Sequence, residues 1–211
     1  MAHVATFDEL NELGIKRRSM PYEQYFGEMG IPEEEKERRK DLAEQIETIF
    51  RYMFMLYGTE YTAEELRMIV YEQFLNVSTA FLGIAAPTAY LMHYTAQLAE
   101  ETVRVTEERA SEEDPYWTSE DRAVNIAEGE ANSIGNYGDL EDAIREGKYL
   151  KTWATMGDNR VRGTHKEVDG VSIPIEEPFE VGDSLLMFPR DTSLGASRDE
   201  IDGCRCWLEF P

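Results

Sequence analysis

The change from helical to extended patterning that decides the fold class lies in residues 139–155, Asp139-Leu-Glu-Asp-Ala-Ile-Arg145-Glu-Gly147-Lys-Tyr-Leu-Lys151-Thr-Trp-Ala-Thr155. Residues 139–145 are typical of a helix, and Gly147 is the kind of residue that follows a helix C-terminus. From Lys151 to Thr155 the residues alternate as they do in a strand with one buried face. The stretch therefore predicts that a helical part of the chain ends near residue 147 and that a β-rich part follows.

Upstream of this point, apolar residues recur at spacings of three and four, which predicts a series of helices. The first begins near Pro32 and ends at Gly58, and Thr62-Ala-Glu-Glu65 is a capping box that starts the second. The expected helices cover about residues 32–58, 62–82, 87–109, 118–135 and 139–145. The pattern leaves open whether the fourth ends near Gly135 or continues past Tyr137.

Downstream, short apolar runs separated by glycines predict strands at about residues 151–155, 171–175, 185–188 and 204–210. We therefore predict an α+β fold, with a helical N-terminal region followed by a small β-rich C-terminal module. The expected domains are a loosely structured arm (1–31), a helical region (32–117) and a module of one helix plus a small β-rich part (118–211). In the arm, Met20-Pro-Tyr-Glu-Gln-Tyr-Phe carries aromatic residues that would dock on a core or on a neighbouring subunit.

The charge of the chain narrows the classes of partner. It holds 21 Lys and Arg against 43 Asp and Glu, a formal net charge of −22. Such a chain repels phosphate backbones, so strong direct binding to nucleic acid is not expected. The acidic residues either keep the protein soluble and monomeric before assembly or face a basic protein partner. The most apolar stretch, residues 74–92, is interrupted by polar residues, glycine and proline, so no membrane association is expected.

The two cysteines, Cys204 and Cys206, are separated by one residue. On a strand such residues point to the same side about 6.5 Å apart, which is at the outer limit of disulfide geometry. A disulfide between them is not expected, and this fits a reducing cytoplasm.

The densest group of polar and reactive residues lies in residues 155–170 and in the final Cys-x-Cys motif. The candidate site residues are Asp158, Arg160, Arg162, His165, Asp169, Cys204, Arg205 and Cys206. Arg160 and Arg162 are interpreted first as partners of Asp158, Asp169 or Glu167 and second as contacts to a phosphate or a protein partner. His165 is interpreted first as a hydrogen-bonded structural histidine and second as a catalyst.

Short motifs follow one another through residues 118–208 in an order that is more specific than any one of them. They are Ser119-Glu-Asp-Arg-Ala, Glu130-Ala-Asn132 with Asn136-Tyr, Trp153-Ala-Thr155, Asp158-Asn-Arg160-Val-Arg162, His165, Val168-Asp169-Gly170, Pro178-Phe179, Phe188-Pro189 and Cys204-Arg205-Cys206. As a set they resemble the phage Mu F-like minor head proteins, also called phage head morphogenesis proteins. The helical N-terminal part is compatible with that family and carries less of its signature.

The resemblance implies a minor capsid protein that is made beside the portal protein of a tailed phage. It implies association with the portal and with capsid or scaffold proteins during procapsid assembly, and some family members influence DNA packaging or ejection. Docking without turnover is implied, so neither enzymatic activity nor a cofactor is expected. The expected location is the virion, in the capsid interior, with the host cytoplasm as the site of assembly.

Many members of the family carry Cys-x-x-Cys before the Asp-Gly step and Cys-x-Cys further on, which suggests a metal-binding knuckle. Here the first two positions are Arg162 and His165, and an arginine stays protonated and cannot bind a metal. We expect hydrogen bonds to replace the metal, with His165 near Cys204 or Cys206 and Arg162 paired to a carboxylate such as Asp169. The alternative is a metal ion held by His165, Cys204 and Cys206.

An alternative function is a nuclease- or nucleotidyl-type enzyme with a histidine base and an arginine phosphate clamp. The cluster that it would use consists of Asp158, Arg160, Arg162 and His165. No second histidine lies near in the sequence, and no Walker A, GxGxxG or HExxH motif occurs. A third possibility is an adaptor with no link to phages.

Overall fold

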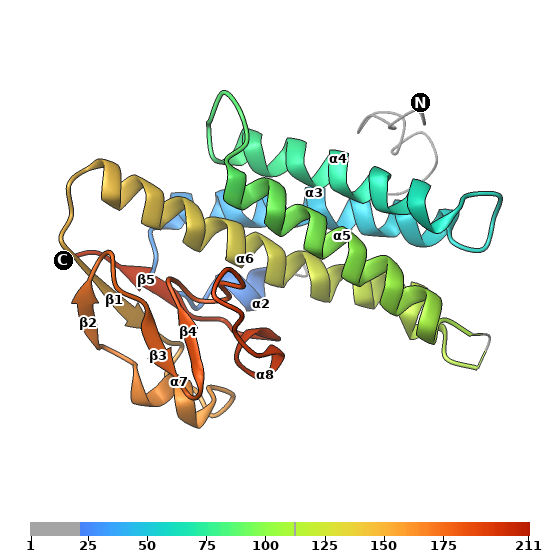
Figure 1. Ribbon diagram of the computed structural model, residues 1–211. Coiled ribbons are helices and arrows are strands. Elements are labelled where there is room, and N and C mark those ends of the chain that lie inside the picture. Colours follow the sequence, from blue (N-terminus) through green and yellow to red (C-terminus); the bar gives the residue numbers. More distant parts are fainter. Residues whose placement is uncertain (1–21, 112) are drawn as a thin grey trace. The chain divides into compact units, whose positions relative to one another are not determined.

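The predicted α+β class is confirmed by the structure, a computed structural model that describes residues 22–111 and 113–211 (Figure 1). The helices are α2 (Glu23–Phe26), α3 (Glu33–Leu56), α4 (Ala63–Phe81), α5 (Ala89–Arg109), the 3-10 helix η1 (Pro115–Thr118), α6 (Glu120–Arg145), α7 (Gly163–Glu167) and α8 (Arg198–Ile201). The strands are β1 (Leu150–Ala154), β2 (Ser172–Pro174), β3 (Phe179–Val181), β4 (Ser184–Leu186) and β5 (Trp207–Glu209).

The described residues form two compact units. Unit 1 consists of residues 41–127, and unit 2 combines residues 22–40 with residues 128–211. Helices α3 and α6 each contribute residues to both units. The domain boundaries expected from the sequence, at residues 32 and 118, stay a prediction.

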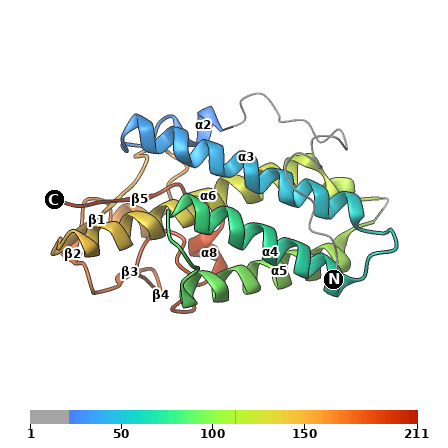
Figure 2. The same cartoon turned by 90° about the horizontal axis from the view of Figure 1, so that it is seen from above.

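Unit 1 is helical, and its helices begin where the capping residues predict. The Thr62 hydroxyl accepts the backbone N–H of Glu65, and the Glu65 carboxylate accepts the backbone N–H of Thr62, so the predicted capping box is confirmed. Thr88 caps α5 in the same way through the N–H of Leu91. Helices α4 and α5 lie side by side in both views (Figures 1 and 2). None of the helices in the described residues is long and apolar enough to cross a membrane.

One arginine joins three elements of unit 1. Arg122, near the start of α6, is buried and donates to the hydroxyl of Thr106 on α5 at 2.7 Å. Its guanidinium lies over the rings of Phe54 and Trp117, 4.9 and 5.1 Å from their centroids. Burial lowers the pKa of Arg122 to about 10, so it remains charged at neutral pH. Stacking on two aromatic faces and bonding to a hydroxyl compensate for part of the lost hydration.

Unit 2 contains the two small sheets of the described chain. Strands β2, β1 and β5 form an antiparallel sheet in that order, and β3 pairs with β4 in a hairpin. Trp153 on the central strand is fully buried and meets the ring of Phe179 on β3 edge-on, 5.2 Å between centroids. Trp153 is therefore a core residue of unit 2.

Three features of unit 2 differ from expectation. Residues 22–31, predicted to be loosely structured, contain the helix α2. Burial of Tyr22, Tyr25 and Phe26 confirms the expectation that the aromatic residues of this segment dock on a core, where they remove a large apolar area from water. The other part of the predicted arm lies outside the described residues. Strand β3 and helix α8 were not predicted at all, since elements of three or four residues carry almost no periodicity.

Helix α6 continues without a break to Arg145, past Gly135. Two of the glycines of this helix, Gly129 and Gly135, are explained by the close approach of buried arginines. A Cβ at Gly135 would lie 2.4 Å from Nε of Arg39, and a Cβ at Gly129 would lie 2.5 Å from an Nη of Arg190. Glycine therefore serves packing here and does not end the helix.

Lys151 on β1 is fully buried, and its ammonium group donates to the carbonyl of Met187 at 2.7 Å. Burial lowers the pKa of Lys151 to about 8 from an ordinary value of 10.5. Because the folded pKa lies below the unfolded one, the folded chain loses stability as the pH falls from about 10.5 to about 8, and the loss is complete below that.

We therefore expect Lys151→Met to raise the free energy of unfolding by roughly 1–3 kcal/mol at pH 7, with a gain that shrinks above pH 8. Urea unfolding of both chains between pH 6 and pH 10.5 measures this. Lys166→Met, at an exposed position, is the matched control and should show no such pH-dependent gain. A Lys151→Met chain that is less stable than the wild type at pH 7 would contradict the expectation.

Candidate functional site

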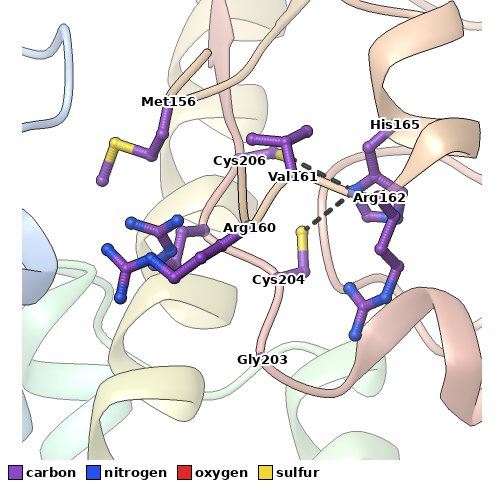
Figure 3. A pocket seen from close by; sticks show the side chains of 9 residues that line it. Met156, Arg160, Val161, Arg162, His165, Gly203, Cys204 and Cys206 are labelled. Carbon is purple, nitrogen blue, oxygen red and sulfur yellow. Dashed lines mark hydrogen bonds between the residues drawn. The ribbon is translucent and has the colours of Figure 1, made fainter. Parts of the chain in front are cut away.

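The candidate residues His165, Cys204 and Cys206 meet inside unit 2 (Figure 3). Nδ1 of His165, on α7, lies 3.3 Å from Sγ of Cys206 and 3.6 Å from Sγ of Cys204. All three side chains are buried, with 1 to 3% of their surface exposed. The expectation that His165 lies near one of the cysteines is confirmed, and both cysteines are free thiols.

The other ring nitrogen of His165 is held by Glu200 on α8. Nε2 lies 3.0 Å from the Glu200 carboxylate, which also accepts the Thr164 hydroxyl at 2.8 Å. Gly182 makes room for this carboxylate, because a Cβ there would lie 2.6 Å from Glu200 Oε1. Gly182 also has a φ of 57°, which favours glycine. Glu200 thus fixes the orientation of the imidazole so that Nδ1 faces both sulfur atoms.

The pKa values of the two thiols are shifted in opposite directions. The hydrogen bond from Cys206, together with the bond from His165, lowers the pKa of Cys204 well below its usual range. The same bond with Cys204, together with burial, raises the pKa of Cys206. Burial acts to lower the pKa of His165, but its contacts with Cys204 and Glu200 outweigh burial and raise it. Deprotonation is therefore easier at Cys204 than at Cys206.

The loop after β1 holds the other candidate residues. Asp158 pairs with Arg160 at 3.2 Å and with Arg205 at 2.6 Å, as the structural interpretation of the arginines predicts. The hydrogen bond from Arg205 and those from Arg160 lower the pKa of Asp158 to about 2. One carboxylate thereby links this loop to the Cys-x-Cys segment.

The predicted pairing of Arg162 with Asp169 is wrong. Arg162 donates to the backbone carbonyl of Asp202, just before the Cys-x-Cys segment. The Asp169 carboxylate instead accepts the backbone N–H of Thr155 and closes the turn after β1. The physical reason is that the Asp169 carboxylate is engaged by the turn that it closes, while the Asp202 carbonyl offers an acceptor within reach of Arg162.

Backbone carbonyls of the Cys-x-Cys segment are held by residues distant in the sequence. Asn132 and Asn136, on α6, each donate a side-chain N–H to the carbonyl of Cys206 at 3.1 Å. The hydroxyl of Tyr25, on α2, donates to the carbonyl of Cys204 at 2.8 Å. Asn132, Asn136 and Tyr25 were not among the candidate site residues, although the first two lie in motifs that carry the resemblance.

A buried arginine orients these two asparagines. Arg39 on α3 donates to the side-chain oxygens of Asn132 at 2.7 Å and Asn136 at 3.3 Å. The same guanidinium pairs with Asp139 at 2.5 Å and with Glu35 at 3.0 Å. Because each amide oxygen is taken by Arg39, each amide N–H is directed to Cys206. One feature of the sequence points to this buried arginine. Gly135 lies within α6, where the absence of a side chain leaves room for Arg39.

A small pocket of about 20 Å³ opens beside the thiols. Its lining includes Arg160, Arg162, His165, Cys204 and Cys206 (Figure 3). That volume accommodates about one water-sized ligand. A group of two thiols and one imidazole can hold a soft metal ion or form a closed hydrogen-bonded cluster.

No protein-family model matches this chain, and no curated protein or solved structure does so either.

Proposed function

We propose that the chain is a minor head protein of a tailed phage that associates with the portal during procapsid assembly. It acts by docking to other proteins, in the capsid interior, without turnover. The proposal rests on the resemblance of residues 118–208 to phage head morphogenesis proteins. The positions of the motif residues within unit 2 also support the proposal.

The supporting observation is that motif residues far apart in the sequence contact one another in unit 2. Asn132 and Cys206 are 74 positions apart and are joined by a hydrogen bond. Asn136 donates a side-chain N–H to the carbonyl of Pro189 at 3.3 Å, and His165 contacts both cysteines. A chance match to scattered motifs gives no reason for their residues to meet. If the motifs are the signature of a single folded module, their residues should lie close together in that module.

The charge of the helical unit supports a protein partner rather than nucleic acid. Its arginines are engaged by neighbouring acids, for example Arg67 by Glu100 at 2.6 Å and Arg104 by Glu101 at 2.7 Å. With a net charge of −22, many carboxylates remain to repel a phosphate backbone.

The alternative of a nuclease- or nucleotidyl-type enzyme receives less support. It needs His165 as an accessible base beside Asp158 and the arginines. His165 is 1% exposed and has partners at both ring nitrogens, while Asp158 is paired with Arg160 and Arg205.

We expect the purified chain to be retained by an immobilised portal oligomer from the same genome. If the acidic helices form the contact, retention will fall at high salt, because exposed charges are screened over about 8 Å at physiological ionic strength. A pull-down at low and high salt measures this, and duplex DNA is the control ligand that should not be retained. Folded chain that binds no portal at any salt concentration would count against the proposal.

A further inference from the structure

We propose that His165 Nδ1 and the sulfur atoms of Cys204 and Cys206 form a three-ligand site for a thiophilic divalent metal ion, with zinc as the expected occupant. This inference rests on the geometry of unit 2 and holds whether or not the chain is a phage head protein. It replaces the expectation of a metal-free cluster.

The distances between the three groups fit a bound metal. Zinc lies about 2.3 Å from sulfur and about 2.0–2.1 Å from nitrogen, so tetrahedral geometry separates the sulfur and nitrogen atoms by about 3.6 Å. The observed separations from Nδ1 are 3.3 Å to Cys206 and 3.6 Å to Cys204, and all three atoms lie within 4.8 Å of one another. A single N–H on Nδ1 would favour one sulfur, whereas a metal ion needs both at similar distances.

The surroundings of His165 are those of a metal-binding histidine. Such a histidine usually donates its second ring N–H to a carboxylate, which fixes the tautomer and makes the ligating nitrogen more basic. Glu200 occupies that position at 3.0 Å from Nε2, and Thr164 in turn holds Glu200 at 2.8 Å. In the tautomer whose Nε2 proton is donated to Glu200, Nδ1 presents its lone pair to the two sulfur atoms.

The local charges also fit. Two thiolates neutralise a divalent ion, and this removes the unfavourable burial of a lone thiolate. The arginines nearby are already compensated, since Asp158 pairs with both Arg160 and Arg205. The indole N–H of Trp153 is buried and interacts with the side chain of Cys206, where it acts to lower the pKa of the thiol, and a metal-bound thiolate would accept this N–H.

The fourth coordination position faces the small pocket. The pocket is lined by all three ligand residues and has a volume of about 20 Å³, enough for one water molecule. We therefore assign the fourth ligand to solvent, in an arrangement of three protein ligands and one exchangeable position.

Cobalt(II) provides the test, because cobalt bound to thiolates gives an intense charge-transfer band in the near ultraviolet. We expect the metal-depleted full-length chain to bind one equivalent of cobalt with this band, and to release it to zinc. The chain purified without chelator should contain about one zinc ion per molecule. Cys204→Ser and Cys206→Ser should each weaken the band, and His165→Gln should reduce metal content.

His93→Gln is the matched control, since His93 lies exposed on α5 in unit 1. It should keep full metal content. Glu200→Gln should retain the band and weaken metal affinity by roughly 10–100-fold, as loss of the carboxylate behind a ligating histidine does. If the cysteine variants do not fold, the wild-type cobalt spectrum and its loss on chelation decide the matter.

Folded wild-type chain that contains no metal and gives no charge-transfer band with cobalt would overturn the proposal. So would an unchanged zinc content in the folded Cys204→Ser/Cys206→Ser double variant.

Discussion

Replacing Arg39 by methionine is expected to lower the free energy of unfolding by about 3–5 kcal/mol, because it removes one partner of a buried ion pair. Arg39 is fully buried and serves four partners, which are Glu35, Asn132, Asn136 and Asp139. Methionine keeps an unbranched apolar stem but lacks the guanidinium and donates no hydrogen bond. The two amide oxygens and the Asp139 carboxylate would then lack their donor, which is the costly half of a broken pair.

The loss should depend on pH. Burial, only partly offset by the charge of Arg39, raises the pKa of Asp139 to about 6. Because the folded pKa lies above the unfolded value of 3.8, the destabilising contribution of this carboxyl grows as the pH rises from 3.8 to about 6 and is complete above that, and removal of the Arg39 charge should enlarge it. The Arg39→Met variant should therefore be most destabilised at pH 8 and less so at pH 5.

Urea unfolding monitored by tryptophan fluorescence measures the effect of Arg39→Met. Arg38→Met is the matched control, because Arg38 is the neighbouring residue on α3, with a half-exposed side chain, and bonds to Glu35. Exposed pairs of this kind contribute about 0–1 kcal/mol. Equal losses in the two variants would contradict the role assigned to Arg39.

Gly135→Ala is expected to destabilise the chain by roughly 1–3 kcal/mol, as overpacking of a core does. The expected sign is opposite to the intrinsic one, since alanine in a helix interior is ordinarily favoured over glycine by about 1 kcal/mol. The cause is the new methyl group, which would lie 2.4 Å from Nε and 2.6 Å from Cζ of Arg39. The guanidinium cannot move aside without giving up its buried partners.

A double-mutant cycle isolates this clash. In an Arg39→Ala background the obstructing side chain is gone, so Gly135→Ala should stabilise the chain by about 0.5–1 kcal/mol. The change of sign between the two backgrounds is the predicted result. A Gly135→Ala substitution that costs the same in both would show that the glycine is needed for another reason.

The helical elements could be predicted from the sequence because their signals are local. The capping box at Thr62 and Glu65 and the break between residues 82 and 88 lie within a few positions of the helix ends that they determine. The short strand β3 and helix α8 could not be predicted, since they depend on contacts within unit 2 rather than on a repeating pattern.

The candidate site was predicted in part. The ordered motifs led to His165, Cys204 and Cys206, which do meet. Glu200 and Arg39 were missed because a buried polar partner is chosen by tertiary contact. Arg39 and Asn132 are 93 positions apart, and Glu200 is one acidic residue among 43.

For Arg162 the sequence suggested a partner, and that partner is wrong. Sequence proximity suggested Asp169 as its partner, whereas its hydrogen bond reaches the carbonyl of Asp202, 40 positions away. The sequence shows which side chains carry charge, and it does not show which carbonyl groups lie within their reach.

The proposed function is tested most directly by the protein content of virions and procapsids from the phage or prophage whose genome encodes this chain. Particles would be purified on density gradients and analysed by mass spectrometry, with the portal protein as the internal reference. The account predicts peptides of this chain in procapsids and in particles, at a constant ratio to the portal protein across gradient fractions. Chain that is expressed and folded but found only in the host lysate, with none in portal-containing particles, would contradict it.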